Sequence, residues 1–138
     1  MNDMTYDKPL PVPTQESQPY WDGLKSHKLV LQRCAMCNKT RHYPRPMCDA
    51  CHSLQCEWFQ ASGKGTVHSW AVYHHAFHPG FKRDIPYVVV TIDLQEGVRM
   101  IAPLEENDAS LLSLGLALRI TYDDANDEIT LPRCCIDA

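Results

Sequence analysis

Two pairs of cysteines give this sequence its clearest chemical signature. Cys34 and Cys37 form one Cys-x-x-Cys motif, Cys48 and Cys51 form a second, and ten residues separate the pairs. Two such knuckles can present four thiolates to one tetrahedral metal ion. Four thiolates leave no open coordination position, so the spacing predicts one structural metal per chain. Zinc is the expected ion, and iron in a rubredoxin-like site is the alternative, because thiolates alone do not select between them.

Basic residues surround these motifs. Because a divalent ion held by four thiolates carries a net charge of −2, Arg33 and Arg45 are interpreted as cations that neutralise the centre. Lys39 and Arg41 lie between the two knuckles, and we expect both side chains to be exposed.

Other metal-ligand residue types are weaker candidates. His52 and Cys56 lie near enough in sequence to replace a ligand, but neither has a better position than the four cysteines. His74, His75 and His78 also invite a metal interpretation. On a strand, however, His74 and His78 point to one face and His75 to the other, so we expect surface or packing histidines.

The sequence contains no defensible catalytic constellation, neither a Ser-His-Asp order, nor paired carboxylates, nor a dinucleotide fingerprint. Gly63-Lys64-Gly65 lacks the Ser or Thr that follows lysine in a phosphate-binding loop, so it is interpreted as a turn. Cys134 and Cys135 are expected to be reduced thiols rather than a strained disulfide. We therefore expect no catalytic residues in this chain.

A short helix is expected to precede the cysteine motifs. Ser17 can act as its N-cap, and Pro19 falls in the first turn, where a missing N–H costs little. Tyr20, Trp21 and Leu24 then share one side of the helix. Two interpretations of Tyr20 and Trp21 stay open: packing in the core, or contact with a partner protein.

Strand signals dominate the rest of the chain. Leu29 to Arg33 and Leu54 to Gln60 flank the cysteine motifs, and turns separate five further strands. These are expected at residues 66–77, 87–94, 98–102, 118–122 and 128–131. A helical turn at 109–114, placed before the fourth of them, is typical of the OB-fold, a small Greek-key barrel.

We therefore predict a mainly β protein in three parts. These are an N-terminal arm and short helix over residues 1–28, a rubredoxin-like zinc ribbon over 29–60, and a five-stranded OB-fold barrel over 61–138.

Composition limits the classes of function. The chain has 138 residues with 17 acidic and 13 basic side chains, a net charge of −4 that disfavours a protein built to grip phosphate backbones. The longest largely apolar stretch, residues 111–118, is too short to span a membrane. The N-terminus lacks a basic region followed by an apolar core, so a cytoplasmic location is expected.

Arm, ribbon and barrel in this order resemble a known family. The sequence is similar to zinc-ribbon/OB-fold proteins associated with acyl-CoA metabolism and catalogued as a domain of unknown function. The matching segments are Pro11–Thr14, Pro19–Leu24, Leu29, Gln32–Cys37, Tyr43–Arg45, Cys48–Cys51, Ser62–Val67, Pro86–Val88, Gly97–Arg99 and Leu131–Pro132.

The resemblance implies a non-catalytic accessory subunit in a hetero-oligomer with a thiolase-fold enzyme, such as a thiolase, an aldolase or an acyltransferase. In such assemblies this protein bridges or completes the enzyme that processes the acyl-CoA thioester, and the catalytic residues belong to the partner. The sequence departs from the family where Asn38 and His52 replace a frequent glycine after each knuckle. It also departs at the C-terminal edge, where the family often carries an aromatic residue after Leu-Pro and this chain has Arg133 followed by Cys134 and Cys135.

A single-stranded nucleic-acid-binding module is the alternative function, because zinc ribbons and OB-folds both serve that purpose elsewhere. Tyr73, Phe77 and Tyr87 are candidates either for base stacking or for the barrel core. The many acidic residues of the C-terminal half weigh against binding a polyanion.

The loop between the first two barrel strands is a candidate binding element. Phe81 offers an apolar or stacking surface, and Lys82 and Arg83 are adjacent cations suited to CoA phosphates or to a partner protein. A plain solvated loop is the simpler interpretation.

Overall fold

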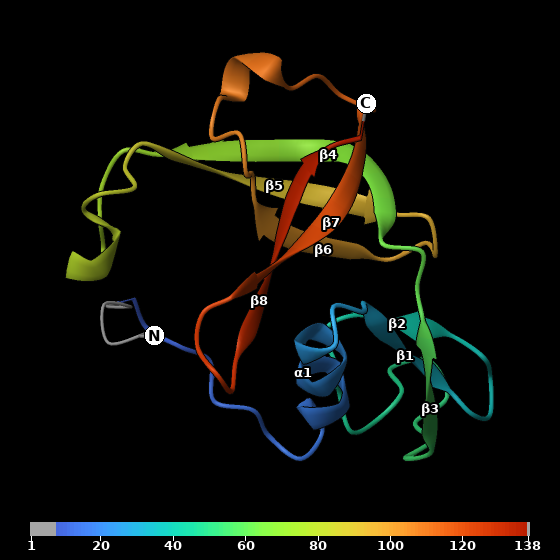
Figure 1. Ribbon diagram of the computed structural model, residues 1–138. Helices are drawn as coiled ribbons and strands as arrows, with labels where there is room; N and C mark the ends of the chain where they lie inside the picture. The colour runs from blue at the N-terminus through green and yellow to red at the C-terminus, as the bar shows by residue number, and fades with distance from the viewer. Residues whose placement is uncertain (1–7, 138) are drawn as a thin grey trace.

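Two antiparallel sheets and one α-helix make up residues 8–137, the part of the chain that the computed structural model describes (Figure 1). The smaller sheet has the order β2-β1-β3, and the larger has the order β6-β5-β4-β7-β8. The strands are β1 (Val30–Cys34), β2 (Thr40–Arg41), β3 (Cys56–Gln60), β4 (Lys64–Tyr73), β5 (Tyr87–Leu94), β6 (Arg99–Pro103), β7 (Ala117–Asp124) and β8 (Thr130–Ile136). Two 3-10 turns, η2 (Pro79–Phe81) and η3 (Ala109–Leu111), lie in the loops.

The helix α1 (Gln18–Lys25) begins where the sequence predicts. Ser17 occupies the N-cap position, but its hydroxyl makes no capping bond and instead accepts the Thr14 N–H at 2.9 Å. Tyr20 and Leu24 are buried in the core, and the partly buried Trp21 packs against it. The apolar side of α1 therefore holds the helix against the rest of the protein.

Gly23 lies where α1 approaches the smaller sheet. A β-carbon at this position would come within 2.9 Å of the Val30 side chain and 3.1 Å of the Lys28 carbonyl oxygen. The glycine weakens the isolated helix, but it permits the close contact through which the helix is stabilised.

The larger sheet confirms the predicted fold class, with five antiparallel strands and η3 before the fourth. β5 alternates regularly between buried and partly buried residues. The sheet is not closed into a barrel. Its two edge strands meet at an isolated parallel bridge between Leu104 and Cys134, beside which the Glu105 N–H donates to the Cys134 carbonyl at 2.8 Å.

The last strand is longer than predicted. β8 begins at Thr130 and continues through Cys134 and Cys135, which are free and buried. Desolvation raises the pKa of the Cys134 thiol to about 12. Cys134 therefore serves as a small apolar core residue and not as a reactive thiol.

Within residues 8–137, no helix combines the length and the apolar character that crossing a bilayer requires.

Candidate metal centre

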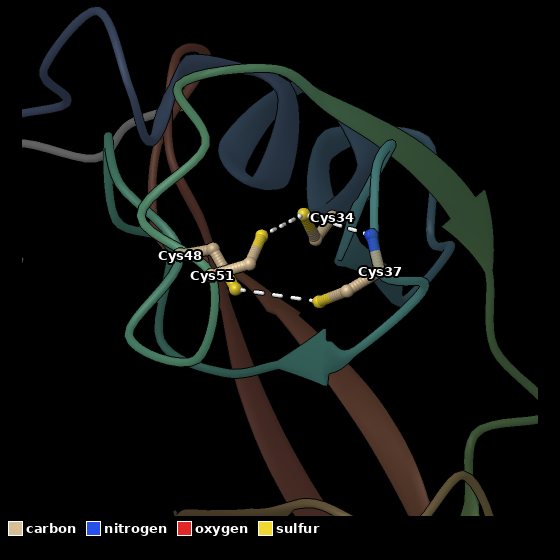
Figure 2. A group of neighbouring side chains, drawn as sticks. All are labelled: Cys34, Cys37, Cys48 and Cys51. Carbon is tan, nitrogen blue, oxygen red and sulfur yellow. Dashed lines mark hydrogen bonds between the residues drawn. The ribbon is translucent and has the colours of Figure 1, made fainter.

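The four predicted ligands converge in the smaller sheet. Cys34 ends β1, Cys37 lies in the loop that follows it, and Cys48 and Cys51 lie in the loop between β2 and β3. All four Sγ atoms lie within 4.8 Å of one another, and Figure 2 shows the side chains facing a common centre. Within the described part of the chain, this is the single group of three or more such side chains that could hold a metal ion.

The spacing of the sulfurs fits a tetrahedral ion. Sγ of Cys34 lies 3.5 Å from Sγ of Cys51, and Sγ of Cys37 lies 3.6 Å from Sγ of Cys48. Four sulfurs at about 2.3 Å from a zinc ion would be separated by about 3.8 Å. The first cysteine of each motif is buried and the second is exposed, so the site lies near the surface of the protein.

The two knuckles repeat one backbone pattern. The N–H of Asn38 donates to the Cys34 carbonyl at 3.0 Å, and the N–H of His52 donates to the Cys48 carbonyl at 2.9 Å. Both donors have left-handed backbone conformations, with φ of 65° and 64°. The frequent family glycine is thus replaced by residue types that are enriched in this conformation, and the knuckle geometry is retained.

Backbone amides prepare the buried sulfurs for metal binding. The N–H groups of Cys37 and Met36 point at Sγ of Cys34 and lower the pKa of this thiol to about 6. The N–H groups of Cys51 and Ala50 likewise lower the pKa of Cys48. These bonds favour the thiolate, which is the form that binds a metal.

A buried polar network supports β1 and β2 beside the centre. Gln32 accepts through Oε1 from Arg41 Nε at 2.5 Å and from the Arg45 N–H at 2.9 Å, and its amide nitrogen lies 3.3 Å from Sγ of Cys56. Arg41 also donates to the Arg45 carbonyl at 2.9 Å. Sequence reasoning missed this network, although strand alternation places Gln32 on the same face as Cys34.

The expectation that Arg41 is exposed was wrong, because its side chain is 2% exposed. It lies opposite Gln32 in the β1–β2 register, so it faces inward with Gln32. Lys39 is exposed, as expected, and pairs with Asp49 at 2.9 Å.

The two arginines expected to neutralise the metal have carboxylate partners. Arg33 pairs with Glu57 at 3.1 Å and stacks over the ring of Phe59 at 4.4 Å. Arg45 lies 3.6 Å from Asp49. Since Arg33 and Cys34 are consecutive strand residues, their side chains point to opposite faces, which turns the Arg33 guanidinium away from the cluster.

His52 and Cys56 lie outside the four-sulfur cluster, and the three histidines near β4 form no metal-binding group within residues 8–137. A different histidine, His42, packs against Tyr20 with ring centroids 5.1 Å apart. Burial, assisted by the charge of Arg45, lowers the pKa of His42 to about 4, so this ring is neutral at physiological pH.

The other predicted contact residues are placed differently. Tyr20 is 3% exposed, so its side chain offers almost no surface to a partner protein, whereas Trp21 is partly exposed. Phe81 is not the free stacking surface that the sequence suggests. Its ring stacks on Tyr87 with centroids 5.5 Å apart, and the Lys8 ammonium lies 5.6 Å from its centroid.

Lys82 and Arg83 are exposed in the loop after η2. A cavity of about 170 Å³ has walls that include the neighbouring Phe81 together with Tyr87 and Arg133, but Lys82 and Arg83 do not line it. Of the two interpretations left open for Tyr73 and Phe77, the structure does not favour the core, because these residues are 37% and 80% exposed.

Comparison with known proteins agrees with this geometry. Residues 21–57 match the family model "ChsH2, rubredoxin-like zinc ribbon domain", and residues 58–123 match "ChsH2, C-terminal OB-fold domain". A solved structure named "Ltp2-ChsH2(DUF35) aldolase" has a chain that is 33% identical. It superposes with a TM-score of 0.82 over 92% of this chain and 98% of that chain.

The chain belongs to the DUF35 family. A DUF35 domain-containing scaffold protein of Pyrococcus furiosus is 30% identical over 110 residues, which are 78% of each chain. A probable enoyl-CoA hydratase alpha subunit of Thermomonospora curvata is 34% identical over 125 residues. That match covers 91% of this chain but 39% of the relative, so the chain spans about two fifths of that protein.

Proposed function

We propose that this DUF35 chain is a non-catalytic accessory subunit of an enzyme complex that acts on acyl-CoA thioesters. Its partner is proposed to be a thiolase-fold enzyme, such as a thiolase, an aldolase or an acyltransferase, whose active site this chain bridges or completes. The observation that carries the proposal is the match over 98% of a chain whose name joins DUF35 to an aldolase. The hydratase alpha subunit and the scaffold protein among its relatives support the same class.

The metal centre supports a structural role. We propose zinc as the ion held by Cys34, Cys37, Cys48 and Cys51, because the sulfur spacing and the zinc-ribbon match both fit it. Iron remains the alternative that metal analysis distinguishes. With four thiolates as ligands the ion has no open position for substrate, so its contribution is to fold the ribbon. Reduced thiolates also suit the cytoplasm, the proposed location.

Direct binding of CoA by this chain is a narrower proposal, which substitutions in the loop after η2 can test. The cavity beside Phe81, at about 170 Å³, lies below the volumes of about 300–1,000 Å³ typical of small-molecule sites. The cations Lys82 and Arg83 therefore suit a contact at the edge of a CoA molecule bound mainly by the partner, or a contact with the partner itself.

A double variant separates these two roles. If Lys82→Ala with Arg83→Ala removes a CoA contact, the KM for the acyl-CoA substrate rises while the complex still assembles. If the loop docks on the partner, assembly itself fails. If assembly and kinetics are both unchanged, the loop contacts neither CoA nor the partner and is a solvated surface loop.

Affinity purification of the tagged protein from its native host, with mass spectrometry of the eluate, tests the proposed function. We expect an acyl-CoA-processing enzyme subunit in near-equal amount. A Cys48→Ser variant is the matched control, because loss of the ribbon should remove the partner from the eluate. Recovery of nucleic acid with no enzyme subunit would instead support the alternative, a single-stranded nucleic-acid-binding module.

One observation favours that alternative. Tyr73 and Tyr87 stack with centroids 5.0 Å apart, and Phe77 in the loop after β4 is 80% exposed, so aromatic side chains are available at this end of the sheet. Single-strand binding uses such platforms. Tyr87, however, is stacked by Tyr73 and by Phe81, which leaves little of its ring surface for a base.

A further inference from the structure

The hairpin of β4 and β5 extends beyond the strands on either side of it. Figure 1 shows this extension, which ends in the loop that carries η2. β7 pairs with β4 only over Lys64–Thr66. The contact ends at Val67, which donates to the Leu116 carbonyl at 3.0 Å and accepts from the Gly115 N–H at 2.9 Å. From Ser69 to Tyr73, β4 pairs with β5 on one edge and with no described strand on the other.

Hydrogen bonds of β5 identify the backbone groups on this open edge. The Val88 carbonyl accepts from the Leu104 N–H, and the Val88 N–H donates to Asn107 Oδ1, both at 3.0 Å. Val88 thus directs both groups away from β4. Val72 lies opposite Val88, so it forms a non-hydrogen-bonded pair and directs its own N–H and C=O away from β5. Trp70, two residues earlier, has the same orientation.

The open edge lacks the usual protection. Proteins commonly shield exposed strand edges with lysine, proline or inward-pointing charges. Ser69–Tyr73 contains none of these. Val72 is 38% exposed, and the exposed Tyr73 and Phe77 extend the apolar surface toward the tip. Such an edge favours the addition of another strand.

The charge distribution around the open edge indicates which residues the added strand contains. No aspartate or glutamate occurs from residue 58 to residue 83, although the chain as a whole has a net charge of −4, and the carboxylate of the next residue, Asp84, pairs with Lys8. The cations Lys82 and Arg83 lie at the tip, and exposed histidines His74 and His75 follow the open edge. A complementary segment therefore carries acidic residues where it passes the tip.

We propose that the open edge of β4, Ser69–Tyr73, receives an extended, acid-flanked segment of the partner enzyme as an added β-strand. The inference rests on the proposed accessory-subunit function and names the docking site. Main-chain bonds to Trp70 and Val72 would supply affinity, and contacts with Tyr73 and Phe77 would supply specificity. This mode explains why an apolar edge stays open in an isolated chain.

The first test compares Val72→Pro with Val72→Ala in the complex purified from the host. Proline at position 72 removes an outward N–H and leaves the hydrogen bonds to β5 in place, whereas alanine keeps the N–H. With both variants shown to be folded by circular dichroism, we expect Val72→Pro to retain at least about tenfold less partner than Val72→Ala. Equal retention would overturn the inference.

The second test is hydrogen exchange on the wild-type complex. The amides of Trp70 and Val72 should exchange at least about tenfold more slowly in the complex than in the free chain. Protection confined to the ribbon or to β6, with these two amides unchanged, would overturn the inference while leaving the proposed function intact.

A charge-reversal pair tests the acidic character of the partner segment. Lys82→Glu should weaken the complex, and Lys25→Glu, an exposed lysine on α1, should not. Equal effects would contradict an acidic segment at the tip. A wild-type chain that forms dimers which Val72→Pro dissociates would assign the edge to a second copy of the chain. Absence of any enzyme subunit from the eluate would overturn the proposed function and this docking site together.

Discussion

Asn38 and His52 occupy equivalent places in the two knuckles, each with a left-handed backbone that closes the loop around the metal-ligand cysteines. A β-branched residue is strained in this conformation, and glycine is not. We expect His52→Val to destabilise the metal-bound protein by about 1–2 kcal/mol relative to His52→Gly. Denaturant unfolding of the two variants measures the difference, and equal stabilities would show that the left-handed φ is not required.

Cys48 is buried and contributes one of the four sulfurs. Changing it to serine removes a thiolate, and a lobe this small lacks an adequate core without its metal. We expect the bound metal to fall from about one equivalent per chain to well below it, with loss of the ribbon fold and of assembly. Elemental analysis and circular dichroism measure both. A wild-type ribbon that is folded with far less than one equivalent of metal would contradict the account.

The burial of Arg41 could not be predicted from its residue type and its neighbours in the sequence. A charged residue in the segment between two cysteine motifs is ordinarily solvated, and nothing in its neighbours along the chain indicates otherwise. Its burial follows from the β1–β2 register, which places it opposite Gln32, and a two-residue strand has too few positions to show a period.

At the scale of elements, Gln32 joins β1 to β2 through its bonds to Arg41 and to the Arg45 N–H. Gln32→Leu would leave the buried Arg41 Nε–H without its acceptor and would remove the acceptor of the partly buried Arg45 N–H, at a cost of about 1–3 kcal/mol. We expect lower stability of the ribbon and faster metal release to a chelator. Gln60→Leu, on the exposed part of β3, is the control. Metal release at the same rate in both variants would show that the network does not support the centre.

The strands differ in how well the sequence predicts them. Tyr87–Leu94 was predicted to the residue because the segment is rich in β-branched residues and turns bound it. The strand after Gly63 was predicted to reach residue 77, but β4 ends at Tyr73, and apolar Phe77 lies in the loop. The predicted last strand was shorter than β8. Pro132 and the adjacent Cys134 and Cys135 are weak strand signals in the sequence, but pairing with β7 keeps this segment in the sheet.

At the scale of the whole molecule, charge opposes binding to a polyanion. From Asp93 onward the chain has ten acidic residues and three arginines. We expect weak or no binding to single-stranded DNA or RNA at roughly 150 mM salt. Fluorescence anisotropy with a labelled oligonucleotide measures it, and a submicromolar Kd would return the nucleic-acid-binding function to first place.

The candidate site was more predictable than its surroundings. The spacing alone predicted that Cys34, Cys37, Cys48 and Cys51 converge, and their Sγ atoms do lie within 4.8 Å of one another. The open edge of β4 was not predictable, because it depends on how far β7 follows β4. That length is set by tertiary packing and leaves no local signal in the sequence.

We propose that this chain completes an acyl-CoA enzyme and performs no chemistry itself. Turnover of a panel of acyl-CoA thioesters, including 2-enoyl-CoA and 3-oxoacyl-CoA substrates, tests it most directly. The assay uses this chain alone, the co-purified partner alone, and the two recombined. We expect no turnover by this chain, low turnover by the partner, and full turnover on recombination. Turnover by this chain alone, or equal turnover by the partner with and without it, would contradict the account.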